Sequence, residues 1–191
     1  MTNWAERYEA QETPWDVSGP HPELKARFAR LDGEQSALVP GCGFGHDALF
    51  LAEAGLAVTA LDLAPQVEAA VGDKLRAAGA KLHICDAFAW ESSERFDLVF
   101  EHTFLCALEP ELRSSWAALM QHCVKPGGRF LAVAFPGGKA AELGGPPFGY
   151  SVDDMAELLG ASFEKTFDEP VQNGVERRDW EERWVEFQRA E

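Results

Sequence analysis

The chain has few positive charges and no long apolar run, and each shortage excludes a class of protein. Its 191 residues carry 17 Lys and Arg against 32 Asp and Glu, a formal net charge of −15. A surface this acidic repels phosphate backbones and anionic lipids, so we expect neither nucleic acid nor a membrane as partner. No apolar run approaches the length of a membrane span. The opening residues MTNWAERYEAQE lack the apolar segment of a signal peptide.

Cysteines are also scarce and scattered. Cys42, Cys85, Cys106 and Cys123 form no CxxC pair, the spacing typical of zinc and redox motifs. Scattered reduced thiols are usual in cytoplasmic proteins, so we expect a cytoplasmic chain with no metal site, in which Cys106 is a packing residue. At this length, with 46% hydrophobic residues, we expect one globular domain over residues 1–191 and a monomer.

Strand-like and helix-like segments alternate along the chain. Strands are predicted at 36–39, 56–61, 81–85, 96–100, 129–135, 163–167 and 183–188, and helices at 23–31, 46–54, 65–78, 110–123 and 152–159. Ser151 and Asp154 form a capping-box pattern at the start of the last helix. Val185 and Phe187 alternate with polar residues, which predicts a half-exposed antiparallel strand at the end. The pattern therefore predicts an α/β fold: a doubly wound, mostly parallel, seven-stranded sheet with an antiparallel last strand.

Three glycines follow the first predicted strand, in the stretch LVPGCGFGHDALFL. Gly41, Gly43 and Gly45 have GxGxG spacing, which differs from the dinucleotide pattern GxGxxG. In a doubly wound sheet, ligands bind at the carboxyl ends of the strands. Because glycine has no side chain, a ligand there can approach the main chain closely. The turn is a candidate ligand site.

Acidic residues close the next two predicted strands. Asp62 ends the second strand, where a carboxylate can accept both ribose hydroxyls of an adenosine. Asp86 follows the third strand, where its side chain or the backbone of Ala87 could hold an adenine amino group. With the glycine turn, these residues predict an adenosine cofactor.

The first helical turn after the glycines helps to choose between cofactors. Asp47 would repel the phosphates of a dinucleotide, but it would suit an ammonium group. S-adenosylmethionine has an amino acid tail and a sulfonium and carries no phosphate, so it fits better than NAD. A nicotinamide-dependent oxidoreductase and a binding protein without catalysis are the alternatives.

Four segments carry a family resemblance: NWAERYEAQETPWDVSGPHPEL, LVPGCGFGHDALFLAEAGLAVTALDLAP, FDLVFEHTFLCALEPELRSSWAALM and GPPFGYSVDDM. They resemble the class I S-adenosylmethionine-dependent methyltransferases and, more closely, the thiopurine S-methyltransferase superfamily with its thiol and halide methyltransferase branch. The resemblance implies a Rossmann-like methyltransferase fold, with S-adenosylmethionine as donor and S-adenosylhomocysteine as product. It implies a small soft acceptor, such as a thiol, hydrosulfide, halide, thiopurine, or selenium or tellurium compound. A small-molecule O- or N-methyltransferase is the alternative.

The resemblance also implies a role for each part of the chain. Residues 1–34 would cover the cofactor, 35–135 would form the cofactor-binding core, 136–150 a substrate loop, and 151–191 the last helix and strands. Tyr8 occupies a place where thiopurine enzymes tend to carry a second Trp, and His102 one where they carry Arg. The implied cofactor-binding residues are Trp4, Tyr8, Trp15, Gly41, Gly43, Gly45, Asp62, Asp86, Ala87 and His102.

Methyl transfer from a sulfonium mainly requires alignment of donor and acceptor and exclusion of water. A thiol titrates near pH ~8.5, so a nearby base or cation raises its reactive fraction. His102 is the candidate for that role and Arg113 the second; a hydrogen-bonded structural His and a surface Arg are the alternatives. Phe148 and Tyr150, in the Gly- and Pro-rich loop 136–150, are expected to supply an apolar wall.

Overall fold

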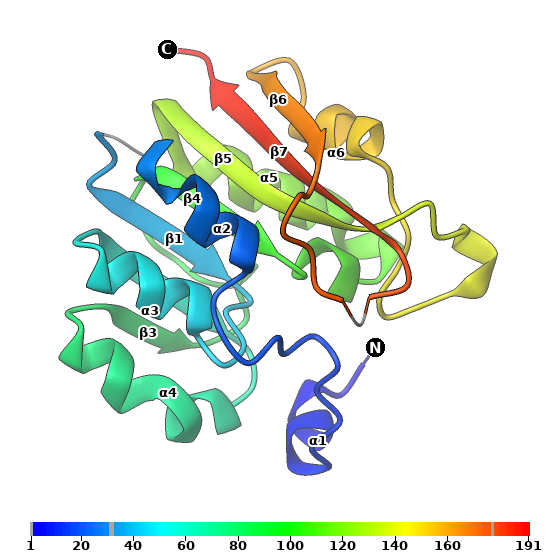
Figure 1. The fold of residues 1–191 in the computed structure, drawn as a ribbon. Helices are drawn as coiled ribbons and strands as arrows, with labels where there is room; N and C mark the ends of the chain where they lie inside the picture. The colour runs from blue at the N-terminus through cyan, green and yellow to red at the C-terminus, as the bar shows by residue number, and fades with distance from the viewer. Residues whose placement is uncertain (1, 31–32, 177) are drawn as a thin grey trace.

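Seven strands form one mostly parallel sheet in the computed structural model, which describes residues 2–30, 33–176 and 178–191 (Figure 1). The strand order is β3-β2-β1-β4-β5-β7-β6, and β7 pairs antiparallel with both β5 and β6. This confirms the predicted doubly wound sheet with an antiparallel last strand. The strands are β1 (Ser36–Pro40), β2 (Ala57–Asp62), β3 (Lys81–Ile84), β4 (Phe96–His102), β5 (Val124–Gly137), β6 (Phe163–Pro170) and β7 (Glu181–Arg189).

Helices cover both faces of the sheet (Figure 1). The α-helices are α1 (Trp4–Glu9), α2 (Pro22–Arg27), α3 (His46–Glu53), α4 (Gln66–Ala77), α5 (Arg113–Cys123) and α6 (Val152–Leu159). Short 3-10 turns lie at Phe28–Arg30, Leu105–Ala107, Pro110–Leu112 and Ala141–Leu143. Within the described ranges, no helix is both long enough and apolar enough to cross a bilayer.

The sheet separates two apolar cores. On one face Leu24, Leu51 and Val71 come from α2, α3 and α4. On the other, Trp116 of α5 packs edge-on against Phe130 of β5, with ring centroids 5.6 Å apart. Burial of both sheet faces explains the nearly continuous apolar runs of the central strands.

The last strand differs from its prediction. Val185 and Phe187 are buried as expected, but Trp184 and Glu186 on the opposite face are buried too. The strand lies between β5 and β6, and both of its faces are covered: Val185 and Phe187 belong to one apolar core and Trp184 to the other. Both oxygens of the Glu186 carboxylate are hydrogen-bonded there: Oε1 accepts from Trp184 Nε1 at 2.8 Å, and Oε2 accepts from Arg129 Nη2 at 2.7 Å.

Several helix and strand boundaries also differ from the predicted ones. The predicted 23–31 helix becomes α2 followed by a 3-10 turn, and residue 31 lies outside the described residues. Strand β5 begins directly after α5, at Val124 instead of the predicted residue 129, and runs through Gly127 and Gly128. Helix α1 was not predicted; Asn3 caps it by accepting a hydrogen bond from the Glu6 N–H. The capping box of Ser151 and Asp154 is present.

The topology gathers several loops at one edge of the sheet. Strand order reverses at β1, which pairs with β2 on one side and β4 on the other. The turn after β1, Asp62 of β2 and His102 of β4 therefore lie at the same carboxyl edge. Because β7 runs antiparallel, the segment before Glu181 reaches that edge too, opposite Gly137 of β5.

Candidate active site

A cavity of about 360 Å³ lies at this edge. Its walls come from the N-terminal segment, the turns after β1 to β4, the end of β5, the loop after it and the segment before β7. The lining residues are Thr2, Trp4, Arg7, Tyr8, Pro14, Trp15, Gly41, Gly43, Asp62, Leu63, Cys85, Asp86, Ala87, Phe88, Thr103, Phe104, Cys106, Ala107, Leu108, Glu109, Leu112, Phe135, Pro146, Pro147, Arg178, Asp179 and Trp180.

The glycine turn forms the floor of the cavity with bare backbone. Gly41 has φ +59°, and a Cβ there would lie 2.5 Å from the Phe104 ring. Gly43 has φ +56°, and a Cβ on it would lie 3.5 Å from the Tyr8 hydroxyl and 3.6 Å from Trp15 Nε1. Any side chain at Gly41 would meet both backbone strain and a clash. Gly45 differs from its prediction: it does not line the cavity, and a Cβ on it would lie 2.9 Å from Val71 of α4.

Two carboxylates lie beside this floor. Asp62 accepts hydrogen bonds from the N–H groups of Gly43 and Ala64, at 2.8 and 2.9 Å. Burial raises the pKa of Asp62 although these hydrogen bonds oppose the shift. Asp86 accepts a hydrogen bond from the Phe88 N–H at 2.9 Å. The predicted residues Asp62, Asp86 and Ala87 thus line one cavity together.

An aromatic cluster from the N-terminal segment closes over the floor. Trp15 makes edge contacts with Trp4 and Tyr8, with ring centroids 5.3 and 5.4 Å apart. The Arg7 guanidinium lies 5.7 Å from the Trp4 ring centroid and 5.1 Å from that of Trp15. All four side chains line the cavity, so residues 2–15 form a lid on the side where cofactor contact was expected.

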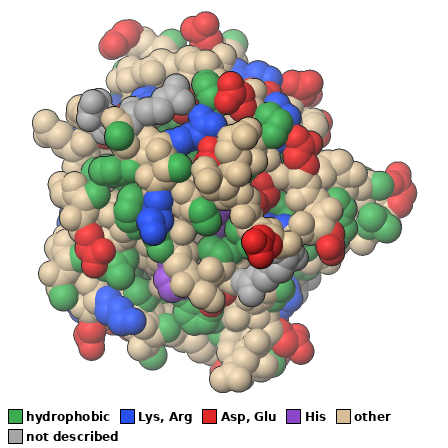
Figure 2. Space-filling model, in the orientation of Figure 1, with side chains coloured by type: hydrophobic (Ala, Val, Ile, Leu, Met, Phe, Trp, Pro, Cys, Tyr) green, Lys and Arg blue, Asp and Glu red, His purple; other side chains and the backbone are tan. Residues whose placement is uncertain are grey.

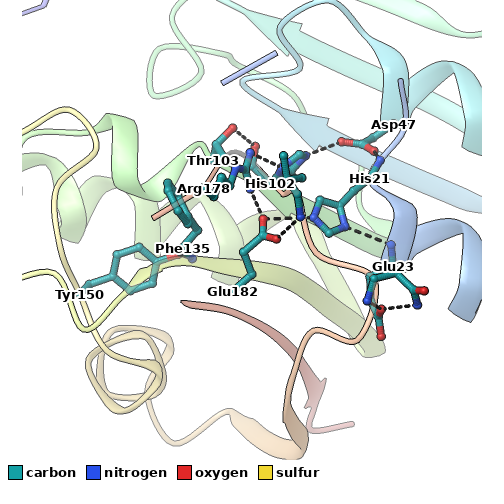
Figure 3. Close-up of polar contacts among 11 residues, drawn as sticks. His21, Glu23, Asp47, His102, Thr103, Phe135, Tyr150, Arg178 and Glu182 are labelled. Carbon is teal, nitrogen blue, oxygen red and sulfur yellow. Dashed lines mark hydrogen bonds and ion pairs between the residues drawn. The ribbon is translucent and has the colours of Figure 1, made fainter. Parts of the chain in front are cut away.

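His102 lies beside the cavity rather than in its wall. Its Nδ1 is 2.8 Å from Asp47 Oδ2 and its Nε2 is 2.9 Å from Arg178 Nη2 (Figure 3). Because a guanidinium only donates, Nε2 must accept, and the proton is on Nδ1 facing Asp47. Burial lowers the pKa of His102, although Asp47 opposes the shift. His102 is therefore a neutral imidazole whose two ring nitrogens are both hydrogen-bonded. This arrangement matches the alternative of a hydrogen-bonded structural His.

Asp47 does not face an ammonium site as predicted. Its second oxygen accepts the His21 N–H at 2.7 Å. Burial works to raise the pKa of Asp47, but His102 and the His21 N–H outweigh it and hold this pKa below its usual range. Asp47 is thus an ion that orients His102 and anchors the chain entering α2.

The same cluster fixes Arg178. Glu182 binds the Arg178 guanidinium and also faces His21 Nε2 at 3.2 Å. Burial works to raise the pKa of Glu182, but its bonds to His21 and Arg178 lower it to about 2. His21, His102 and Glu182 could together ligate a metal ion, yet two of these groups already bind Arg178. These three side chains therefore form a polar cluster around the Arg178 guanidinium, with Glu182 as its ion-pair partner.

Three further residues predicted at the site lie outside the cavity lining. Arg113 does not line the cavity; it donates to the Gly149 carbonyl at 2.8 Å and anchors the loop 136–150. Phe148 and Tyr150 do not supply the wall. Pro146 and Pro147 do so instead, because the Phe148 N–H bonds the Cys106 carbonyl and Tyr150 is buried beneath β5.

Four other residues that line the cavity were not predicted from the sequence. Arg178 and Trp180 were overlooked because they lie in a polar segment before the last strand, and only the fold brings that segment to the carboxyl edge. Phe135 was predicted as the last residue of a strand with no role at the site, but it lines the cavity. Thr103 has φ +65°, which puts a non-glycine residue in the left-handed region directly after His102. No local pattern identifies any of these four.

Glu101 is a buried carboxyl group next to the site. Its Oε1 accepts the N–H groups of Phe104 and Leu105, at 2.6 and 2.9 Å. Its Oε2 has no hydrogen-bond partner among the described residues. Burial raises the pKa of Glu101 to about 7, although the two N–H groups and Arg178 oppose the shift.

We expect Glu101 to make stability depend on pH. The folded state holds the proton up to about pH 7 and the unfolded chain loses it near 4.5, so the free energy of unfolding falls between these values. Glu101→Gln cannot titrate. Between pH 5 and pH 8, the free energy of unfolding of the unmodified protein should therefore fall by roughly 2–3 kcal/mol more than that of the variant. Urea unfolding of both proteins at both pH values measures this, and parallel pH dependences would contradict it.

The comparisons with known proteins identify the family. The family model for thiopurine S-methyltransferase matches residues 1–189. "Probable thiol methyltransferase 2" of Arabidopsis thaliana is 36% identical over 162 residues, covering 82% of this chain and 70% of that protein. "Thiocyanate methyltransferase 1" of the same plant is 32% identical over 165 residues, with the same coverage.

A solved structure agrees on the fold. The N-methyltransferase NodS from Bradyrhizobium japonicum superposes with a TM-score of 0.77 at 19% identity, covering 98% of this chain and 97% of that one. The predicted family, fold and enzyme class are therefore confirmed: the chain belongs to the thiopurine S-methyltransferase family and is an S-adenosylmethionine-dependent methyltransferase.

Proposed function

We propose that this enzyme methylates a small, soft, negatively charged acceptor: a thiolate, hydrosulfide, thiocyanate or halide, or a related thiopurine, selenium or tellurium compound. The observation that carries the proposal is Arg178, a buried cation in the wall of the cavity. Relatives named for thiols and thiocyanate support the same acceptor class.

The cofactor residues are proposed from the cavity itself. Asp62 would hold the ribose, Gly41 and Gly43 would let the donor lie against backbone, and Asp86 with Ala87 would border the adenine. The strained, clash-prone position of Gly41 supports this, because a bare floor serves a ligand in close contact with the main chain. Trp4, Tyr8 and Trp15 would cover the donor and exclude water. S-adenosylmethionine supplies an electrophilic methyl group when it is bound.

Arg178 would hold the acceptor. Its side chain is 6% exposed, and its guanidinium lies 4.6 Å from the Phe135 ring centroid. A guanidinium has more N–H groups than its contacts with His102 and Glu182 use, so it can also donate to an anion. Thiocyanate and halides reach the site already ionised, and a cation beside a thiol favours the thiolate.

His102 would act through Arg178. Its unprotonated Nε2 accepts from Nη2, and Asp47 fixes the tautomer that makes this possible. We therefore assign His102 as a positioning residue for the guanidinium, in place of the base or cation expected from the sequence. Arg113 would act only by holding the loop 136–150.

The remaining assignments rest on charge and placement. Residues 1–34 would cover the cofactor, 35–135 would bind it, 136–150 would border the acceptor, and 151–191 would complete the sheet. We propose a cytoplasmic monomer that acts on small molecules and binds no nucleic acid. Acidic side chains are scattered over the face shown in Figure 2, and no broad basic patch lies there.

Release of S-adenosylhomocysteine in the presence of an acceptor panel tests the function. We expect turnover with thiols, hydrosulfide, thiocyanate or iodide, or with thiopurines or selenium or tellurium oxyanions. Matched hydroxyl and amine compounds should give at least tenfold lower kcat/KM. Turnover confined to the hydroxyl or amine compounds would overturn the soft-acceptor proposal and favour an O- or N-methyltransferase.

A further inference from the structure

One side of the cavity is built from aromatic and proline side chains that two loops bring together. Phe135 lies near the end of β5, Pro146 and Pro147 lie in the loop 136–150, and Trp180 directly precedes β7. All four line the same cavity as Arg178. They bound the compartment that the preceding section assigns to the acceptor.

Contacts hold the Trp180 indole in this wall. Its ring centroid is 6.3 Å from that of Phe135 in an edge contact. The Lys139 ammonium lies 5.0 Å from the centroid of the indole, a distance at which a cation is attracted to a ring face. Lys139 also donates to the Pro147 carbonyl at 2.5 Å. One lysine thus joins Trp180 to the proline wall.

The cavity is small for what it must hold. At about 360 Å³ it is near the lower limit of ligand pockets, which run from roughly 300 to 1,000 Å³. An adenosine cofactor and an acceptor must share this volume. A shared volume of this size favours an acceptor of a few heavy atoms over a heteroaromatic thiol.

We propose that Trp180, held by Lys139 and Phe135, sets the size limit of the acceptor and makes the enzyme prefer small soft anions to bulky aromatic thiols. The inference rests on the proposed function and goes beyond it by naming the residue that selects within the acceptor class. Trp180 is half-buried, so its truncation removes wall area without emptying a core.

The test compares two acceptors, thiocyanate and thiophenol, by kcat/KM at saturating S-adenosylmethionine. Trp180→Ala should raise the ratio of thiophenol to thiocyanate at least tenfold, because the indole no longer fills the space that a phenyl ring needs. Trp180→Phe keeps an aromatic edge against Phe135 and should move the ratio less. Lys139→Met loosens the indole and should move it in the same direction, by a smaller factor.

Leu143 supplies the matched control. It lies in the same loop as Lys139, is 66% exposed and does not line the cavity, so Leu143→Ala should leave the ratio unchanged. An unchanged ratio in Trp180→Ala, with the unmodified enzyme active on thiocyanate, would overturn this inference alone. An unmodified enzyme inactive on every soft acceptor would instead overturn the proposed function. Equal affinity for S-adenosylhomocysteine in all variants shows that the cofactor side is intact.

Discussion

Replacing Asp62 by alanine is expected to weaken the binding of S-adenosylmethionine at least tenfold. The carboxylate closes β2 at the cavity rim, and the N–H groups of Gly43 and Ala64 orient it. A hydrogen bond to a charged group contributes about 1.5–3 kcal/mol, and about 1.4 kcal/mol is one factor of ten in affinity. Loss of a single ribose contact at the weak end of this range therefore already gives a tenfold effect. Isothermal titration calorimetry measures it.

Asp73→Ala is the matched control for this change. It also removes a carboxylate, but from the exposed surface of α4, where Asp73 pairs with Arg76. Its affinity for the donor should equal that of the unmodified protein. Equal affinities of the Asp62 and Asp73 variants would show that Asp62 does not hold the cofactor.

Replacing Arg178 by methionine is expected to lower kcat/KM for thiocyanate or iodide by roughly 10- to 100-fold, the equivalent of one charge-assisted hydrogen bond. Affinity for S-adenosylhomocysteine should change less than about threefold, since the proposal gives Arg178 a contact with the acceptor and none with the cofactor. The two measurements separate an acceptor residue from a general structural one.

The Arg178 variant needs a stability control, because removing one partner of a buried ion pair can cost about 3–5 kcal/mol. Arg178→Lys keeps the positive charge but cannot bind His102 and Glu182 with a planar fork. It should fold more stably than the methionine variant and retain intermediate activity. If the folded methionine variant keeps full activity toward anions, Arg178 does not bind the acceptor.

The part of the cavity lining that we propose for the cofactor was predictable because its signals are local. Gly41 and Gly43 stand next to a strand end, and Asp62 and Asp86 each close a strand, so alternation alone places them at one edge. Trp4 and Trp15 followed from the family resemblance. The fold was predictable for the same reason: apolar runs and glycine or proline breaks mark each element.

The acceptor side was not predictable from local pattern. Arg178 and Trp180 sit in a charged segment with no periodic signal, and they reach the cavity only because β7 inserts antiparallel beside β5. His102 was identified, but its role depends on Asp47 and Arg178, which are far from it in the sequence. Arg113 has the right helix position for a site residue, yet its side chain turns to the Gly149 carbonyl.

A crystal of the enzyme with S-adenosylhomocysteine and iodide provides the most direct test, because iodide is located by its anomalous scattering. The account places the ribose hydroxyls on Asp62, and the iodide in contact with the Arg178 guanidinium within the same cavity. A nucleoside bound away from Asp62, or an iodide held at that edge without Arg178, would contradict it.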